Sequence, residues 1–232
     1  MTRERIVIGA IVVALIVLAV AKQVITSETW VYLIVVIPSI ILHEISHGVA
    51  ALWAGDDTAK KAGRLTLNPV PHIDILGTLI IPAALAIAGL PVFGYAKPVP
   101  VDPSRMRHPR NDTVLVSLAG PATNIVIAVA AAFWLRQEHG LSLTGGPWAQ
   151  RIPLALGLVN VILAAFNLLP IPPLDGSSVV ERVLPKDWQQ TYNKIRPYGM
   201  LVLMGLVLLD GSFLAQHVFI PFENLWLRLV QQ

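Results

Sequence analysis

The sequence predicts an all-α, polytopic membrane protein, and two features of its composition carry this prediction. Of the 232 residues, 55% are hydrophobic and 13% are charged, whereas an ordinary soluble domain carries about 25% charged residues. The apolar residues gather in runs, and a helix needs about 20 such residues to cross a bilayer. The chain has no cysteine, which excludes a disulfide framework and a cysteine-ligated metal site. We expect one membrane-embedded domain over residues 1–232.

Four apolar runs are predicted to span the membrane, at residues 6–21, 30–53, 113–135 and 152–173. The first run follows Arg3 and Arg5, but no small-residue cleavage site ends it, so we expect an uncleaved helix. A fifth run covers residues 198–209. Residues 213–230 either return across the membrane or lie on its surface, with Pro221 as a bend. The prediction is therefore five or six transmembrane helices.

The basic residues indicate how the chain is oriented in the membrane. Most of the 17 Lys and Arg residues lie in four stretches, at residues 1–5, 55–75, 94–111 and 171–197. Because cytoplasmic loops are enriched in Lys and Arg, we expect these stretches and the N-terminus to be cytoplasmic. The positive charge is then a topology signal, so nucleic acid is not an expected partner. The expected location is the cell membrane, with the chain in contact with the lipid bilayer.

The apolar stretch 76–93 lies between two of the predicted cytoplasmic stretches. A single crossing would place these two stretches on opposite sides of the membrane. The stretch contains Gly77, Pro82, Gly89 and Pro91, which disfavour a continuous helix. We therefore expect a re-entrant or broken segment, with an ordinary spanning helix as the competing interpretation. Before it, weak alternation of apolar residues over 63–75 predicts short strands.

A polar cluster interrupts the second apolar run at residues 43–47, which read His-Glu-Ile-Ser-His. On a helix, His43 and His47 share one face, so both imidazoles can bind one metal ion. Glu44 lies beside the first histidine, where its carboxylate can accept a proton from water at that metal. Three ionisable groups in an apolar helix are costly and usually functional. The pattern predicts a zinc site with Glu44 as catalytic base, against a buried polar network that only joins helices.

A catalytic zinc ion usually has three protein ligands and one open position, so two histidines are not sufficient. Without cysteine, the third ligand must be His, Asp or Glu. The candidates near membrane segments are His72, Asp74, Asp175, Glu181 and Asp210. Asp175 follows a proline-rich stretch at the predicted cytoplasmic end of a span, at a depth similar to His43 and His47. A loop aspartate in an ordinary turn before glycine is the competing interpretation.

Three motifs resemble those of the site-2 protease family of intramembrane zinc metalloproteases. They are His-Glu-Ile-Ser-His at 43–47, Gly-Pro-Ala-Thr-Asn at 120–124 and Asn-Leu-Leu-Pro-Ile-Pro-Pro-Leu-Asp-Gly at 167–176. Their order, spacing and placement on three membrane segments are similar to the catalytic core of the family, here residues 30–185. Residues 63–74 and 94–100 are similar to a compact bacterial branch. The chain lacks the polar insertion that holds a PDZ domain in many members.

The resemblance implies one zinc ion per chain, with His43, His47 and Asp175 as ligands and Glu44 as the catalytic base. It implies that the protein hydrolyses peptide bonds in or near transmembrane segments of other membrane proteins, often to release a regulator. The active site is then expected nearer the cytoplasmic side. Without a PDZ domain, substrate choice is expected to depend on the membrane core, on residues 55–111 or on an adaptor protein.

Three further polar residues are candidates for supporting roles. Asn124 and Asn167 match polar positions of the family motifs, where a side-chain amide can hold an unwound substrate strand or the oxyanion. For both, an interhelical hydrogen bond is the competing interpretation. His72 is a candidate for a residue that gates or covers the zinc site, against an ordinary loop histidine.

Two other classes of protein stay open from the sequence. One is a membrane zinc protease with a glutamate as third ligand, for which Glu181 is the nearby candidate. The other is a zinc-binding membrane protein without catalysis, such as a pseudoprotease or a transporter. A transporter should carry ionisable groups along a path, whereas here they gather at one predicted depth.

Overall fold

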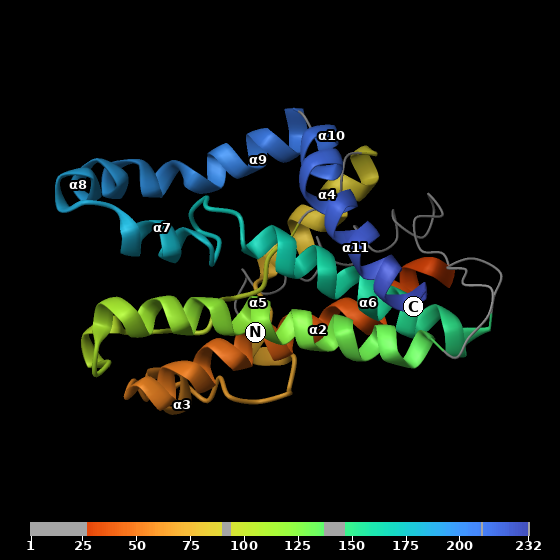
Figure 1. Ribbon diagram of the computed structural model, residues 1–232, viewed down its shortest axis with the longest axis horizontal. Coiled ribbons are helices and arrows are strands. Elements are labelled where there is room, and N and C mark those ends of the chain that lie inside the picture. The colour runs from red at the N-terminus through yellow and green to blue at the C-terminus, as the bar shows by residue number, and fades with distance from the viewer. Residues whose placement is uncertain (1–26, 90–93, 137–146, 210, 232) are drawn as a thin grey trace, which may run out of the picture.

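Three long helices form the centre of the molecule. The computed structural model describes residues 27–89, 94–136, 147–209 and 211–231, so the predicted span 6–21 lies outside the described residues. The central helices are α2 (Ser27–Ala54), α5 (Pro109–Leu135) and α6 (Trp148–Asn167), which pack against one another along their lengths (Figure 1). Each is apolar and long enough to cross a membrane. They agree with three of the predicted spans.

Small residues let the three central helices approach closely. The buried positions include Ala51 on α2, several alanines of α5 and Ala155, Ala164 and Ala165 of α6. Small side chains at helix contacts are typical of membrane proteins, where close backbone packing replaces the hydrophobic driving force. Each central helix also contains a proline, Pro38, Pro121 or Pro153.

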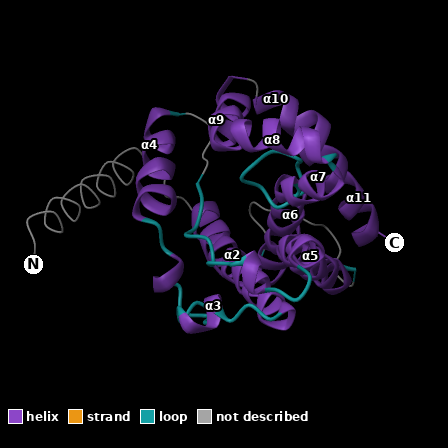
Figure 2. Ribbon diagram, turned by 90° about the vertical axis from the view of Figure 1, so that its left-hand side faces the viewer, coloured by secondary structure: helices purple, strands orange, loops and turns teal. Residues whose placement is uncertain are grey.

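The remaining described elements are short and surround the central helices. Between α2 and α5 they are α3 (Thr58–Lys61), η1 (Val70–His72), η2 (Ile75–Ile80), α4 (Ile81–Ala88) and η3 (Pro103–Arg105). After α6 they are α7 (Ser177–Val183), α8 (Lys186–Ile195), η4 (Arg196–Tyr198), α9 (Gly199–Leu209), α10 (Gly211–Leu214), η5 (Ala215–Phe219) and α11 (Ile220–Gln231). Figure 2 shows α3 below the central helices and α7 to α10 above them.

The prediction of short strands over residues 63–75 is wrong, because the described residues there form turns and the single-turn helix η1. Side chains take backbone donors that a strand pairing would need: Thr66 accepts from the Asn68 N–H at 3.2 Å, and Asn68 accepts from the Val70 N–H at 3.0 Å. Such local bonds compete with sheet formation. Pro69 and Pro71 have no N–H to donate.

The apolar stretch that was expected to re-enter or break forms a short helix over Ile75–Ala88. Its first half, η2, is π-helical, and Asp74 caps it by accepting the Gly77 N–H at 2.8 Å. The helix ends at Gly89, which has a positive φ of 70°. It is shorter than the approximately 20 residues that a simple crossing needs. Residues 90–93 lie outside the described part of the chain.

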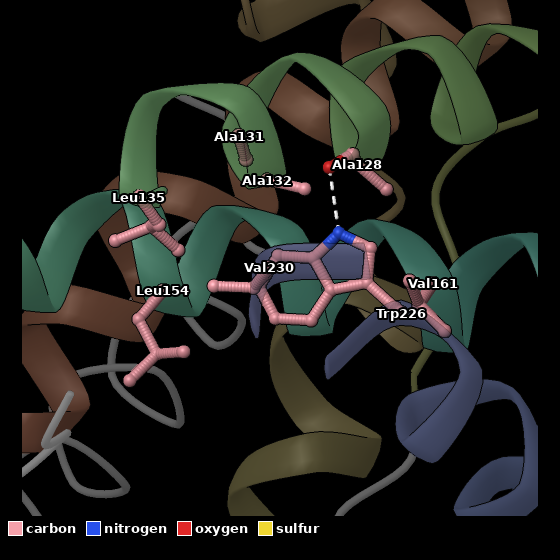
Figure 3. Packing of buried hydrophobic residues seen from close by; sticks show 8 residues of the cluster. All are labelled: Ala128, Ala131, Ala132, Leu135, Leu154, Val161, Trp226 and Val230. Atoms are coloured by element: carbon pink, nitrogen blue, oxygen red, sulfur yellow. Dashed lines mark hydrogen bonds between the residues drawn. The ribbon is translucent and has the colours of Figure 1, made fainter. Parts of the chain in front are cut away.

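The C-terminal helix α11 is held against α5 and α6 by one tryptophan. Trp226 is 4% exposed, and its indole Nε1–H donates to the Ala128 carbonyl at 2.6 Å (Figure 3). Its ring occupies the space beside Gly157, where a Cβ would lie 1.8 Å from the ring. The surrounding cluster joins Leu135 of α5, Leu154 of α6 and Val230 of α11. This cluster lies outside the polar site described below.

Candidate metal centre

Three predicted ligand side chains come together between α2 and the loop that follows α6. His43 and His47, one turn apart on α2, direct their Nε2 atoms to the same point, 3.1 Å from each other. The Asp175 Oδ2 atom lies 3.2 Å from the first and 3.4 Å from the second. Among the described residues, this is the group of His, Asp and Glu side chains that could hold a metal ion.

The Nδ1 atom of each histidine bonds an acceptor outside the candidate metal centre. His43 Nδ1 lies 2.5 Å from Asn124 Oδ1, and His47 Nδ1 lies 2.7 Å from the Val116 carbonyl. Both partners are acceptors, so each Nδ1 donates its proton to them and each Nε2 faces Asp175. Such a bond fixes the ring orientation of a metal-binding histidine.

The convergence of three acceptor atoms fits a cation. Asp175 Oδ2 is buried and has no hydrogen-bond partner, and an unpaired buried carboxylate oxygen is costly. Two ligands about 2.1 Å from a zinc ion, at the tetrahedral angle, lie about 3.4 Å apart. The three observed separations, 3.1, 3.2 and 3.4 Å, are close to this value. Two imidazoles and a carboxylate are a donor set that zinc accepts.

A glycine on α5 makes room for the centre. At Gly120, a Cβ would lie 2.5 Å from both His43 Cε1 and His47 Nε2. No real Cβ approaches other atoms so closely, so any larger residue would displace the histidines. The lack of space beside the two histidines therefore explains why the motif at residues 120–124 begins with glycine.

Asp175 reaches the centre because the chain turns sharply after α6. The Gly176 N–H donates to the Asn167 carbonyl at 2.7 Å, and a Cβ at Gly176 would lie 2.2 Å from the Leu168 carbonyl oxygen. The loop therefore folds back tightly on the end of α6. Ser178 bonds the Asp175 carbonyl through both its N–H and its hydroxyl. These contacts fix the backbone that carries the carboxylate.

Behind the histidines, a chain of buried polar side chains connects the three central helices. Asn124 on α5 donates through Nδ2 to Asn160 Oδ1 on α6, at 2.7 Å. Asn160 donates to the Ser39 hydroxyl on α2, at 2.8 Å, and Ser39 donates to the Val35 carbonyl. Both asparagines are 0% exposed. The chain begins at His43 and thus ties the ring of a candidate ligand to all three helices.

The other predicted site residues lie as follows. Glu44 accepts the Val99 N–H at 2.8 Å through Oε2. Asn167 donates to the Leu163 carbonyl of its own helix at 2.9 Å. His72 is 3% exposed, donates from Nε2 to the Thr66 carbonyl at 3.0 Å, and lies outside the metal group. The structure does not bring Asn167 or His72 into contact with the three ligands.

The remaining candidates for a third ligand also lie apart from the histidines in the described part of the chain. Glu181 pairs with Arg196 at 3.4 Å, and Asp74 caps η2. Asp210 lies outside the described residues.

Sequence reasoning missed Asn160, Ser39 and the backbone of Val99. Asn160 and Ser39 are polar residues inside apolar runs, which is a signal of a buried functional or structural contact. Val99 gives no such signal, because its peptide group and not its side chain makes the contact.

The fold and the three converging side chains are those of a helical protein with long apolar helices and a candidate metal centre, and comparison with known proteins gives its family. The model of peptidase family M50 matches residues 145–209. YwhC of Bacillus subtilis is 36% identical over 83% of this chain and 86% of its own length. Rip2 of Mycolicibacterium smegmatis is 31% identical over 73% of this chain and 63% of its own length.

A third relative, MJ0392 of Methanocaldococcus jannaschii, is 22% identical over 81% of this chain and 44% of its own length. All three relatives carry the words zinc metalloprotease in their names. No solved structure matches the chain significantly. The chain belongs to peptidase family M50, the site-2 proteases, and is a zinc metalloprotease with several membrane-spanning helices.

Proposed function

We propose that this zinc metalloprotease is an intramembrane protease, which cuts peptide bonds in or near transmembrane segments of other membrane proteins. The observation that carries the proposal is the place of the candidate metal centre. Two of its three side chains lie within α2, a helix long and apolar enough to cross the membrane. A protease with its centre at that position meets its substrate inside or at the edge of the bilayer. Release of a regulator by such a cut is regulated intramembrane proteolysis.

We assign the zinc ligands to His43, His47 and Asp175, one ion per chain. When bound, zinc supplies a Lewis acid that polarises the scissile carbonyl and lowers the pKa of water. Glu44 accepts a proton from the attacking water, whose oxygen bonds the carbonyl carbon. Glu44 then passes that proton to the nitrogen of the leaving amine as the peptide C–N bond breaks. His43 and His47 keep their orientation through the bonds of their Nδ1 atoms.

The substrate must present an extended backbone, because a helix hides its peptide groups in its own hydrogen bonds. Residues that weaken helices lower the free energy of this local unwinding. Asn167, at the end of α6 and next to the Asp175 loop, stays a predicted amide donor to the substrate or to the oxyanion. Asn124 supports the centre by holding the His43 ring. Its amide oxygen accepts from His43 Nδ1, and its amide nitrogen donates to Asn160. His72 stays a predicted gate.

The proposed topology places the N-terminus and the centre on the cytoplasmic side, with five or six transmembrane helices in one domain. The clustering of Lys and Arg in the stretches next to His43–His47 and Asp175 supports this orientation. The helix Ile75–Ala88 is too short for a simple crossing, which favours re-entry. Residues 55–111, the membrane core or an adaptor protein then select the substrate.

The test measures zinc content and cleavage of a model transmembrane substrate on the same purified samples. We expect wild type to hold one zinc ion and to cut. Glu44→Gln should retain zinc and lose cleavage by more than about 100-fold, because it removes the proton acceptor. Asp175→Asn should lose both zinc and cleavage. Glu181→Gln is the matched acidic control and should behave as wild type.

Three results would overturn parts of this assignment. Cleavage by Glu44→Gln would exclude Glu44 as the base. Zinc retained in Asp175→Asn and lost in Glu181→Gln would move the third ligand to Glu181. Zinc binding without cleavage of any transmembrane substrate would favour a zinc-binding protein without catalysis.

A further inference from the structure

Residues 94–100 have no regular secondary structure and contact both the helix Ile75–Ala88 and the proposed catalytic base. Its odd-numbered residues direct their backbone N–H groups to acceptors on neighbouring elements. Tyr95 donates to the Gly77 carbonyl at 3.0 Å, Lys97 to the His72 carbonyl at 3.0 Å and Val99 to the Glu44 carboxylate at 2.8 Å. The first two acceptors are backbone carbonyls, and the third is the side chain of Glu44.

The residues around Val99 make its N–H a dedicated donor. Pro98 and Pro100 flank Val99, and proline has no N–H to offer. Proline also restricts the residue before it to extended conformations. Within residues 98–100, the single backbone donor is thus the one that bonds Glu44.

Packing holds this segment on α2 beside the metal centre. Val99 is 7% exposed. At Gly48, next to His47, a Cβ would lie 3.1 Å from Val99 Cγ1 and 2.5 Å from Leu65 Cδ2. The absence of a side chain at residue 48 lets the segment approach the helix closely enough for its N–H to reach Glu44.

The other end of the segment is tied to the helix Ile75–Ala88. A Cβ at Gly77 would lie 2.4 Å from the Tyr95 ring, so the ring rests directly on that glycine. Thr78 also donates to the Tyr95 carbonyl at 3.0 Å. The segment is therefore anchored at both ends.

We propose that the Val99 peptide N–H is a positioning group for Glu44, held in place because residues 94–100 are anchored on α2 and on the helix Ile75–Ala88. The inference rests on the proposed function, in which Glu44 is the base. A bond to one carboxylate oxygen fixes the side-chain rotamer and leaves the second oxygen to accept the proton. Such preorganisation contributes to the rate and not to substrate binding.

The first experiment detects the bond itself by hydrogen exchange of the full-length, zinc-loaded protein in detergent micelles. Peptides that differ by residues 98–100 report on Val99 alone, since the two prolines contribute no amide hydrogen. In Glu44→Ala, exchange at Val99 should accelerate about 10- to 100-fold, the effect of losing a bond to a charged acceptor. The Lys97 amide, which bonds the His72 carbonyl, is the internal control and should not change. An unchanged Val99 rate would overturn the inference.

The second experiment removes the donor and keeps the side chain. Replacing Val99 by its α-hydroxy acid converts the peptide into an ester and deletes only the N–H. The kcat of cleavage should fall about tenfold or more, with KM and zinc content unchanged. Val99→Ala, which keeps the N–H but loosens the packing on Gly48, should lose less of its kcat than the ester variant even where its thermal stability falls further. A merely structural role would instead affect both variants through stability.

The role of Glu44 as base and the positioning role of Val99 are distinguished by separate variants. If Glu44→Gln still cuts, the proposed base is wrong, whatever the exchange at Val99. If Glu44→Gln is inactive and the ester variant has the wild-type kcat, the proposed function stands and the positioning role of Val99 is wrong.

Discussion

The central helices and the region that covers them, residues 55–107, hold the site in different ways. In α2, α5 and α6, buried side chains bond one another, from His43 through Asn124 and Asn160 to Ser39. In the covering region, the buried side chains of Asp56 and Arg64 bond backbone groups. Asp56 accepts the Asp102 N–H at 2.7 Å, and Arg64 donates to the Lys97 carbonyl at 2.6 Å.

This difference separates two parts of the proposed chemistry. The zinc ligands depend on side chains inside an apolar core, where an unpaired polar group is costly. The base depends on a backbone donor delivered by an irregular segment. Changes to the residues that surround or support the three ligands in the central helices should therefore alter zinc binding, whereas changes in the covering region should leave zinc in place. The predictions below test this separation, beginning with the largest expected effect.

Gly120→Ala should abolish zinc binding. The new Cβ would lie 2.5 Å from His43 Cε1 and His47 Nε2, and neither ring can move without breaking its Nδ1 bond. We expect zinc content to fall by more than about tenfold, as for the loss of groups that orient metal ligands. The control is Gly205→Ala in α9, where the new Cβ would meet no described atom within 4 Å apart from its chain neighbours and the nearby backbone of its own helix. Metal analysis of both variants that shows equal zinc would contradict the steric role.

Asn124→Ala should weaken zinc binding by about 10- to 100-fold, because it frees the His43 ring. It also leaves the Asn160 amide oxygen unpaired, which costs about 1–3 kcal/mol of stability. Ser39→Ala should have a smaller effect, since Asn160 Nδ2 retains its bond to the Leu156 carbonyl at 2.8 Å. Titration with zinc and thermal unfolding distinguish the two. Equal zinc affinities in the three proteins would mean that the polar chain only joins helices.

Asp56→Asn should destabilise the covering region without loss of zinc. Asp56 is 0% exposed and accepts bonds from the Thr58 N–H, the Thr58 hydroxyl and the Asp102 N–H. Weakening these bonds to a charged acceptor should cost about 1–3 kcal/mol. Asp57→Asn is the control, since Asp57 pairs with Lys61 and Arg105 at the surface, where ion pairs contribute little. Zinc loss in Asp56→Asn would break the proposed separation.

The same variant has a defined pH dependence. Burial acts to raise the pKa of Asp56, but the hydrogen bonds from Thr58 and Asp102 and the charge of Arg105 outweigh it, so the pKa lies below its ordinary 3.8. A lowered pKa in the folded state contributes stability above the ordinary pKa, and this stability is lost as the pH falls through the folded value. The difference in unfolding temperature between wild type and Asp56→Asn should be full at neutral pH and shrink below about pH 4.

The difference between the central helices and the covering region also explains which parts of the site the sequence could predict. His43, Glu44 and His47 are one turn of a helix, and helical spacing fixes their shared face before any tertiary structure is known. Asp175 required the predicted depth of two spans and the family resemblance. The partners of Asn124 and Asn160 depend on how three helices are rotated about their axes. Apolar runs without a clear polar face do not specify this rotation.

The covering region was less predictable, for a local reason. The alternation of Leu65, Leu67 and Val70 predicted strands, but the side chains of Thr66 and Asn68 take backbone donors in turns. The contact from Val99 to Glu44 joins residues 55 positions apart through a peptide group. A peptide group has the same donor at every residue except proline, so no residue type marks this contact.

The smallest expected effect concerns α11, which lies against α5 and α6 but outside the polar chain. Trp226→Phe removes the indole donor to the Ala128 carbonyl and should cost about 1 kcal/mol. Since Ala128 remains within α5, the α5 backbone that carries Gly120 and Asn124 should stay in place. Thermal unfolding should register the change, while zinc affinity stays at the wild-type value. If zinc affinity falls in Trp226→Phe, the packing of α11 on α5 and α6 also positions the metal centre. The C-terminal helix would then belong to the elements that support zinc binding.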